Sequence, residues 1–206
     1  MNLFRIFYCL FLFKIVSLSG QNDEVSRMLN KEIIIWDNDG TIMGSKNPND
    51  PNKIILPNIQ NVMSSTKAIH VLCSGCKTPE SELQNFDPQN IIKRITALMS
   101  QLPIQVATFS PTIGGIECYV IIKKLKTNDI VIRKAHEEKR YQHLIGSFKK
   151  PEIGMFVVIQ DILKEEFGYS MNSNNSLMIG DTWHDEHAAL KKGIAFLDAT
   201  HIHNMK

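Results

Sequence analysis

Short, uninterrupted apolar runs alternate with amphipathic stretches from about residue 31 onward. The runs are rich in Ile, Val and Leu and show no alternation of apolar and polar residues. This pattern is typical of strands that are buried on both faces of a parallel sheet. We predict five such strands, at Ile33 to Trp36, Ala68 to Cys73, Ile104 to Thr108, Leu177 to Ile179 and Ala195 to Leu197.

The stretches between these runs have the periodicity of helices. In one of them Ile91, Ile95 and Leu98 recur at helical spacing. Alternating strands and helices predict an α/β fold, a three-layer, Rossmann-like parallel sheet with helices on both faces. The predicted helices are Asn58 to Ser65, Pro88 to Gln101, Pro151 to Phe167 and Asp185 to Lys192.

Residues 111–147 depart from the alternation of strands and helices. Two β-branched runs, Ile116 to Ile122 and Ile130 to Ile132, flank a polar turn and predict an inserted β-hairpin. We expect this hairpin to pair with itself and to lie over the ligand site or beside it, as a cap element. Only about 26 residues separate Thr41 from Ala68, so we predict no large cap domain there. Residues 30–206 are expected to form one domain.

Polar residues of particular kinds follow the predicted strands, where ligands bind in folds of this class. A phosphate ester repels an anionic nucleophile unless cations neutralise the phosphoryl oxygens. Carboxylates are hard oxygen ligands of the kind that Mg²⁺ prefers. The residues in question are Asp37, Asp39, Ser74, Gly75, Lys150, Asp181 and Asp185.

These residue types suit the transfer of a phosphoryl group. We assign Asp37 as the nucleophile that forms an aspartyl-phosphate, and Asp39 as the general acid and base. Ser74, the amide of Gly75 and the charge of Lys150 are expected to bind the phosphoryl oxygens.

A Mg²⁺ site is expected in the same place. Its predicted ligands are Asp37, Asp181 and the backbone carbonyl of Asp39. Asp185, one helical turn after Asp181, would support the metal directly or through water. The alternative for Asp185 is a helix cap.

The order of these motifs resembles that of the haloacid dehalogenase (HAD) superfamily. The resemblance rests on DxDGT at residues 37–41, Ser74 after the second strand, Lys150, and GDxxxD at residues 180–185, and it extends over about residues 33–198. It implies a phosphatase or phosphotransferase, because dehalogenases and phosphonatases of this superfamily lack the aspartate at position 39.

A KPxxGM segment from Lys150 to Met155 refines the resemblance. It is similar to the branch that contains histidinol-phosphate and heptose-bisphosphate phosphatases and the 3′-phosphatase domain of polynucleotide kinases. Pro151 is expected at the start of a helix, where its missing amide is tolerated. The chain departs from the pattern at Lys149, where Arg is usual, and it lacks the zinc-binding loop of some members.

The net charge of the chain affects only the choice of the expected substrate. The 23 basic and 21 acidic residues nearly cancel, which gives no support for nucleic-acid binding by bulk charge. We therefore expect Mg²⁺-dependent hydrolysis of a small phosphomonoester. One alternative is a polynucleotide 3′-phosphatase, favoured by KPxxGM and by Lys123, Lys124 and Arg133 of the hairpin. Another is a secreted HAD-like binding protein without turnover.

The first 20 residues and three side-chain types complete the expectations. Residues 1–20 are apolar with a charged start, which predicts a signal peptide and export to the periplasm or outside the cell. The alternative is a retained apolar leader on a cytoplasmic protein, and no stable membrane span is expected. We interpret the CxxC spacing of Cys73 and Cys76 as coincidence, Trp183 as a packing residue, and His184 and His187 as surface or supporting groups.

Overall fold

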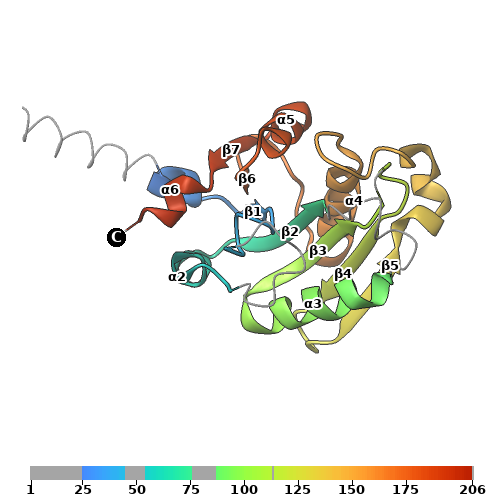
Figure 1. The fold of residues 1–206 in the computed structure, drawn as a ribbon, viewed down its shortest axis with the longest axis horizontal. Helices are drawn as coiled ribbons and strands as arrows, with labels where there is room; N and C mark the ends of the chain where they lie inside the picture. Colours follow the sequence, from blue (N-terminus) through green and yellow to red (C-terminus); the bar gives the residue numbers. More distant parts are fainter. Residues whose placement is uncertain (1–24, 45–53, 76–86, 113, 206) are drawn as a thin grey trace, which may run out of the picture.

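The computed structural model describes residues 25–44, 54–75, 87–112 and 114–205. These residues form a seven-stranded sheet with the order β5-β4-β3-β2-β1-β6-β7 (Figure 1). The pairs β1–β2, β1–β6, β2–β3 and β6–β7 are parallel, whereas β3–β4 and β4–β5 are antiparallel. The predicted α/β class and the parallel core of the sheet are confirmed.

The strands lie where the apolar runs predict them, with ends that shift by at most three residues. Strand β1 keeps its predicted bounds, whereas β2 and β3 extend two residues further because their last residues remain in register with each other. The strands are β1 (Ile33–Trp36), β2 (Ile69–Gly75), β3 (Ile104–Ser110), β4 (Tyr119–Lys123), β5 (Ile130–Lys134), β6 (Ser176–Gly180) and β7 (Ala195–Asp198).

The helices between the strands also match the prediction in number and place. Pro88 and the Asp87 cap, which accepts a hydrogen bond of 2.9 Å from the amide of Gln89, fix the start of α3. Residues 25–29 are helical as well. The helices are α2 (Pro57–Ser65), α3 (Pro88–Gln101), α4 (Gly154–Ile162), α5 (Trp183–Lys192) and α6 (Thr200–His203), with short 3₁₀ helices at Ala135–Glu137 and Lys139–Leu144 and a π turn, η4, at Leu163–Phe167.

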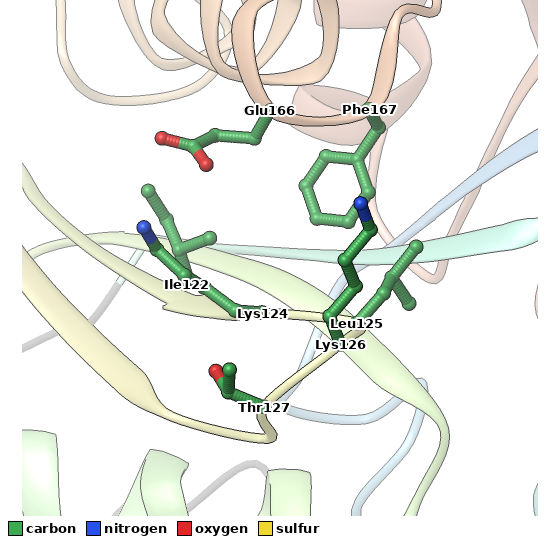
Figure 2. Close-up of a pocket in the computed structure, with 7 residues that line it drawn as sticks. All are labelled: Ile122, Lys124, Leu125, Lys126, Thr127, Glu166 and Phe167. Atoms are coloured by element: carbon green, nitrogen blue, oxygen red, sulfur yellow. The ribbon is translucent and has the colours of Figure 1, made fainter.

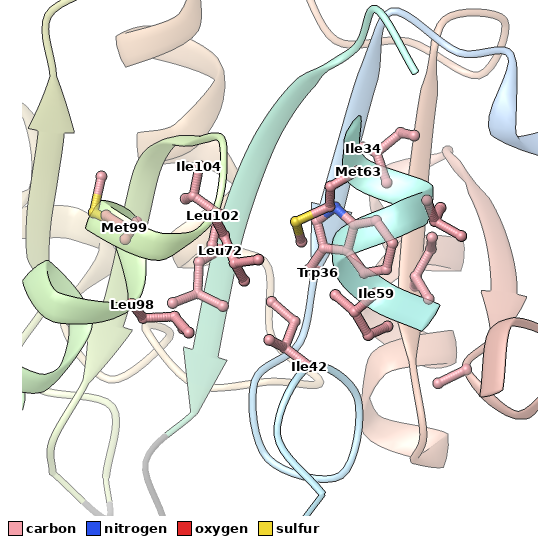
Figure 3. Close-up of a cluster of buried hydrophobic side chains, with 14 of the residues drawn as sticks. Ile34, Trp36, Ile42, Ile59, Met63, Leu72, Leu98, Met99, Leu102 and Ile104 are labelled. Atoms are coloured by element: carbon pink, nitrogen blue, oxygen red, sulfur yellow. The ribbon is translucent and has the colours of Figure 1, made fainter. Parts of the chain in front are cut away.

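Two separate apolar cores lie on opposite faces of the sheet. Alternate residues of β1 enter each of them: Ile34 and Trp36 lie in one, and Ile33 and Ile35 in the other. The first core contains side chains of α2, α3 and α6, and the second contains side chains of α4 and α5. Figure 3 shows the indole of Trp36 among buried side chains of the first core. Burial on both faces explains why the strands are apolar without alternation.

The hairpin of β4 and β5 forms as predicted, but its place differs from our expectation. It pairs with itself and also extends the main sheet, because β4 pairs with β3 from Val106↔Ile122 to Phe109↔Tyr119. Since β4 is antiparallel to β3, the turn after Lys123 lies at the edge where the parallel strands begin. The turn is therefore at the opposite end of the sheet from the predicted site.

The helix of the KPxxGM segment begins later than predicted. Pro151 lies in a turn, and α4 starts at Gly154. A Cβ on Gly154 would lie 2.5 Å from Oγ and 2.6 Å from the carbonyl oxygen of Ser147, and the Gly154 amide donates to that carbonyl at 3.0 Å. This close approach to Ser147, a tertiary contact, fixes the first residue of the helix.

Two expectations fall on the amino-terminal segment. The predicted signal or leader at residues 1–20 lies outside the described residues. Within the part of the chain that the structure describes, no helix combines the length and apolar character needed to cross a bilayer.

Candidate active site

The site lies at the carboxyl end of β1, the central strand. The chain builds β2 and β3 on one side of β1 and β6 and β7 on the other. The order of the strands therefore reverses at β1, and this is where folds of this kind bind their ligands. Asp37 follows β1 directly, and its amide donates to the carbonyl of Ile179 at the end of β6 at 2.9 Å.

Lys150 joins three segments that are far apart in the sequence. Its Nζ donates to Oδ1 of Asp37 at 2.5 Å, to Oδ1 of Asp185, and to the carbonyl of Cys73 at 3.0 Å. The side chains of Lys150, Asp37 and Asp185 are only 6%, 12% and 1% exposed. The structure therefore brings three of the predicted site residues into one buried ion cluster.

The buried cluster shifts the proton affinities of its members. Burial raises the pKa of Asp37 to about 6; the charge of Lys150 opposes this shift, and the carboxylate of Asp185 adds to it. Burial alone would lower the pKa of Lys150, but the Asp37 and Asp185 carboxylates outweigh burial and raise it. Lys150 is thus fully charged near neutral pH, and its ammonium group forms ion pairs with both carboxylates.

The carboxylates also form a group that suits a cation. Within the described residues, one carboxylate oxygen from each of Asp37, Asp181 and Asp185 lies within 4.8 Å of the others. Three carboxylates against one lysine leave an excess of negative charge, and hard oxygen ligands of this kind fit Mg²⁺. The side chain of Asp39 lies outside this group, which agrees with a part for its backbone carbonyl only.

Asp39 and Thr41 lie in the turn after β1. The carboxylate of Asp39 accepts a hydrogen bond of 2.9 Å from the side-chain amide of Asn38, and it contributes to the raised pKa of Asp37, so it lies near the nucleophile position. Thr41 is buried, and its hydroxyl lies 3.5 Å from Oδ1 of Asp181. Its carbonyl accepts a hydrogen bond of 3.0 Å from Nε2 of His203. The turn after β1 is thereby connected to Asp181 on one side and to α6 on the other.

Ser74 and Gly75 reach the same edge through β2. Ser74 is 1% exposed. A Cβ added to Gly75 would lie 3.9 Å from Cε of Lys150, so the strand end and the lysine are neighbours. Gly75 is therefore a neighbour of Lys150, and Ser74 lies between Gly75 and Cys73, whose carbonyl accepts from Lys150. Their predicted contacts with phosphoryl oxygens stay a prediction.

Asp185 is a helix cap, one of the two alternatives that the sequence left open, and it also belongs to the carboxylate group that suits a cation. Its Oδ2 accepts hydrogen bonds from the amide and the hydroxyl of Thr182, at 3.1 and 2.7 Å, and completes a capping box for α5. Its Oδ1 accepts from Lys150. The cap therefore fixes the orientation in which the other oxygen meets the lysine.

Gly180 and Thr182 position Asp185 in ways that the sequence analysis did not predict. A Cβ on Gly180 would lie 2.5 Å from Cγ and 2.6 Å from Oδ2 of Asp185, so only glycine leaves room for that carboxylate. The Thr-x-x-Asp spacing from Thr182 to Asp185 is a recognisable capping-box signal and could have identified the first residue. Gly180 is the glycine of the GDxxxD motif, but its contact with Asp185 follows from the approach of β6 to α5 and is not visible in the sequence.

The basic residues of the hairpin are not arranged around the buried cluster. Arg133 forms a two-pronged pair with Glu138, at 3.0 and 2.7 Å, and lies 3.6 Å from Glu165. Lys124 and Lys126 line a pocket between the hairpin turn and η4, at the edge where the parallel strands begin (Figure 2). The suggested substrate contact by this face finds no support in the structure.

Two of the remaining expectations have different outcomes. The thiol of Cys73 is buried, and burial raises its pKa to about 11, which leaves it protonated and unreactive near neutral pH. Cys76 lies outside the described residues. Trp183, which we interpreted as a packing residue, is 56% exposed and belongs to neither apolar core. It lies at the first position of α5, on the face opposite Asp185, and the sequence alone did not fix that helical phase.

Comparison with known protein families decides between the two branches of the resemblance. The family model described as polynucleotide kinase 3 phosphatase matches residues 32–205. The chain belongs to this family. Membership of the polynucleotide kinase 3 phosphatase family confirms the HAD-like resemblance and supports the polynucleotide branch over the histidinol-phosphate branch. No match was found among curated proteins.

Proposed function

We propose that this protein is a Mg²⁺-dependent phosphomonoesterase that removes the phosphate from the 3′ end of a polynucleotide. The observation that carries the proposal is the carboxylate group of Asp37, Asp181 and Asp185 at the reversal of strand order, in which Lys150 binds the two buried members. The match to the polynucleotide kinase 3 phosphatase family over residues 32–205 supports the nucleic-acid end as substrate. A small phosphate ester was our first expectation, and the family match favours the alternative.

The proposed reaction has two steps on Asp37. A carboxylate oxygen of Asp37 attacks phosphorus, the bond from phosphorus to the 3′ oxygen breaks, and Asp39 gives its proton to that oxygen. Asp39 then takes a proton from water, the water oxygen attacks the phosphorus of the aspartyl-phosphate, and Asp37 leaves as a carboxylate. The second step releases inorganic phosphate and restores both side chains.

The chain's own groups prepare Asp37 for this attack. Lys150, which donates to Asp37 at 2.5 Å, favours the ionised and therefore nucleophilic form against the effect of burial. Lys150 together with Ser74 and Gly75 is assigned to the phosphoryl oxygens. A bound Mg²⁺, held by Asp37, Asp181, the Asp39 carbonyl and, directly or through water, Asp185, would supply further positive charge at the phosphoryl group.

A comparison of matched substrates tests this proposal. The full chain is assayed with one oligonucleotide sequence carrying a 3′ phosphate or a 5′ phosphate, and with a sugar phosphate, in Mg²⁺ and in EDTA. We expect release of phosphate from the 3′-phosphorylated strand in Mg²⁺ only. Asp37→Asn and Asp39→Asn should each lower kcat by at least about 10³-fold, whereas the control Asp129→Asn, in the exposed hairpin turn, should not.

Three results would contradict different parts of the proposal. Activity that survives both Asp37→Asn and Asp39→Asn excludes the aspartyl-phosphate route. A preference for the sugar phosphate would favour a small phosphate ester as the substrate over a polynucleotide end. Absence of turnover on every ester, with folded protein, supports a binding protein without catalysis.

A further inference from the structure

Trp183 differs from the other tryptophan of the chain in its surroundings. Trp36 is fully buried and donates from Nε1 to Nδ1 of His70 at 3.0 Å, whereas Trp183 is 56% exposed. A tryptophan contributes most when its large ring is covered. The exposed ring of Trp183 is therefore a surface on which another flat apolar group can be placed.

The position of Trp183 links this surface to the buried carboxylates. Trp183 is two residues from Asp181 and two from Asp185, so its Cα lies within about 7 Å of theirs. On α5, Asp185 belongs to the buried face, whereas Trp183 and His187 belong to the exposed face. The indole therefore lies on the solvent side of the first turn of α5, the same turn whose buried face carries Asp185.

Two imidazoles hold the indole in a defined orientation. The ring of His184 stacks on it with centroids 3.8 Å apart and an interplanar angle of 28°. The ring of His187 meets it edge-on at 5.2 Å and 88°, and Nδ1 of His187 donates to the Trp183 carbonyl at 2.9 Å. A ring that is already oriented loses little conformational entropy when a ligand stacks on it.

The charges of the protein make such a surface useful for a nucleic-acid substrate. The formal net charge is only +2, Arg133 is paired with Glu138, and Lys124 and Lys126 lie at the other edge of the sheet. Bulk charge therefore contributes little attraction to the phosphate backbone, and other contacts can add affinity. Stacking of bases on aromatic side chains supplies affinity to single strands and does not depend on sequence.

We propose that Trp183, backed by His184, is a stacking platform for a base near the 3′ end of the strand whose phosphate meets Asp37. This inference rests on the proposed function and deepens it. It assigns the recognition of a single-stranded end to α5 rather than to the basic hairpin.

Steady-state kinetics with two strands test the platform. Both strands carry a 3′ phosphate. In one of them the last three nucleotides are abasic. The wild type is expected to prefer the strand with bases by at least about tenfold in kcat/KM, which corresponds to about 1.4 kcal/mol. Trp183→Ala should abolish this preference through KM, and Trp183→Phe should restore most of it.

Fluorescence tests the same contact without turnover. A single strand that ends in a 3′ hydroxyl is added, its binding is followed by the anisotropy of a label on its 5′ end, and acrylamide quenching of tryptophan is measured. We expect bound strand to lower the quenching constant at least about twofold in the wild type, because the exposed indole is covered. In Trp183→Phe only the buried Trp36 remains, and the constant should not change.

The outcomes separate the platform from the proposed function. Turnover of the 3′-phosphorylated strands with the same preference in Trp183→Ala as in the wild type overturns the platform and leaves the function standing. Unchanged quenching at saturating strand overturns it as well. If the protein neither hydrolyses nor binds any strand, both the platform and the proposed function are overturned. Tyr169→Ala, which removes an aromatic ring that is 38% exposed before β6 at the opposite edge, is the matched control and should retain the preference.

Discussion

Two ion clusters in this protein are built from similar side chains and differ in balance and burial. On the surface, Arg133 and Arg140 face Glu138 and Glu165, two positive against two negative charges, with side chains 24–43% exposed. At the end of β1, the single ammonium of Lys150 meets the carboxylates of Asp37 and Asp185, with side chains at most 12% exposed.

The difference shows how a sheet edge becomes a reactive site. The surface cluster satisfies its own charges and fixes the segment after β5 against η4. The buried cluster has more carboxylate than ammonium, and that excess is compatible with a cation and an electrophilic phosphoryl group. Number of ion pairs is therefore a poor guide to function here, and charge balance is a better one.

The largest effect is expected from removal of the buried ammonium of Lys150. Lys150→Met leaves Asp37 and Asp185 buried beside each other, and should lower the free energy of unfolding by about 3–5 kcal/mol and kcat by about 10²–10³-fold. Urea denaturation in EDTA and phosphatase assays measure the two effects. Lys191→Met is the matched control, because its pair with Glu152 is about half exposed. Equal stability of both variants would show that the buried cluster is no different from a surface pair.

A second prediction concerns the cation that the excess charge favours. Mg²⁺ at about 100 times its Kd should raise the free energy of unfolding by about 2.7 kcal/mol, and EDTA should reverse this. Asp181→Asn is expected to lose most of that gain, whereas Asp129→Asn is expected to keep it. Thermal unfolding with and without Mg²⁺ measures the difference. A full response in Asp181→Asn would place the cation elsewhere.

The third prediction uses a buried group that has no opposite charge beside it. His70 accepts from Nε1 of Trp36 at Nδ1, so its proton is on Nε2, which lies 3.0 Å from both the Met63 carbonyl and the Thr66 hydroxyl. Burial lowers the pKa of His70 to about 4. A folded-state pKa below the usual 6.5 means that acid protonates the unfolded chain first, so stability is lost as pH falls through 6.5 toward 4.

The size of this loss can be measured against a variant that does not titrate. Between pH 7.5 and pH 5 the group should contribute a loss of about 2 kcal/mol in the free energy of unfolding. His70→Asn, whose side-chain oxygen can accept from Trp36, should lack this part of the pH dependence. Parallel curves for wild type and variant would show that His70 takes up a proton as readily in the folded state as in the unfolded chain.

The smallest effect is expected in the balanced surface cluster. Arg140→Ala leaves Arg133 beside both glutamates, so the free energy of unfolding should fall by less than about 1 kcal/mol, and less still at high salt. Phosphatase activity should not change. Urea denaturation at low and high salt checks the first point. A loss above about 2 kcal/mol would mean that this cluster holds the edge of the sheet in place.

Local sequence predicted those parts of the fold that local physics determines. The apolar run of β1 and the Asp87–Pro88 start of α3 are examples, and their bounds were predicted without error at these points. The convergence of Asp37, Lys150 and Asp185 followed from strand ends meeting at one edge. Contacts between distant segments were not readable: β4 pairs with β3, Ser147 delays the start of α4, and helical phase exposes Trp183.

The hydrogen bond from His203 to the Thr41 carbonyl has a consequence for the order of biosynthesis. The two residues are 162 positions apart, and Asn58 donates to the carbonyls of Ile202, His203 and Met205 at 2.7–3.3 Å, which holds α6 beside α2. A ribosome makes the turn after β1 long before it makes the partner of that turn in α6, which is 162 positions further along the chain. The nascent chain therefore cannot complete the surroundings of Asp37 until α6 has emerged.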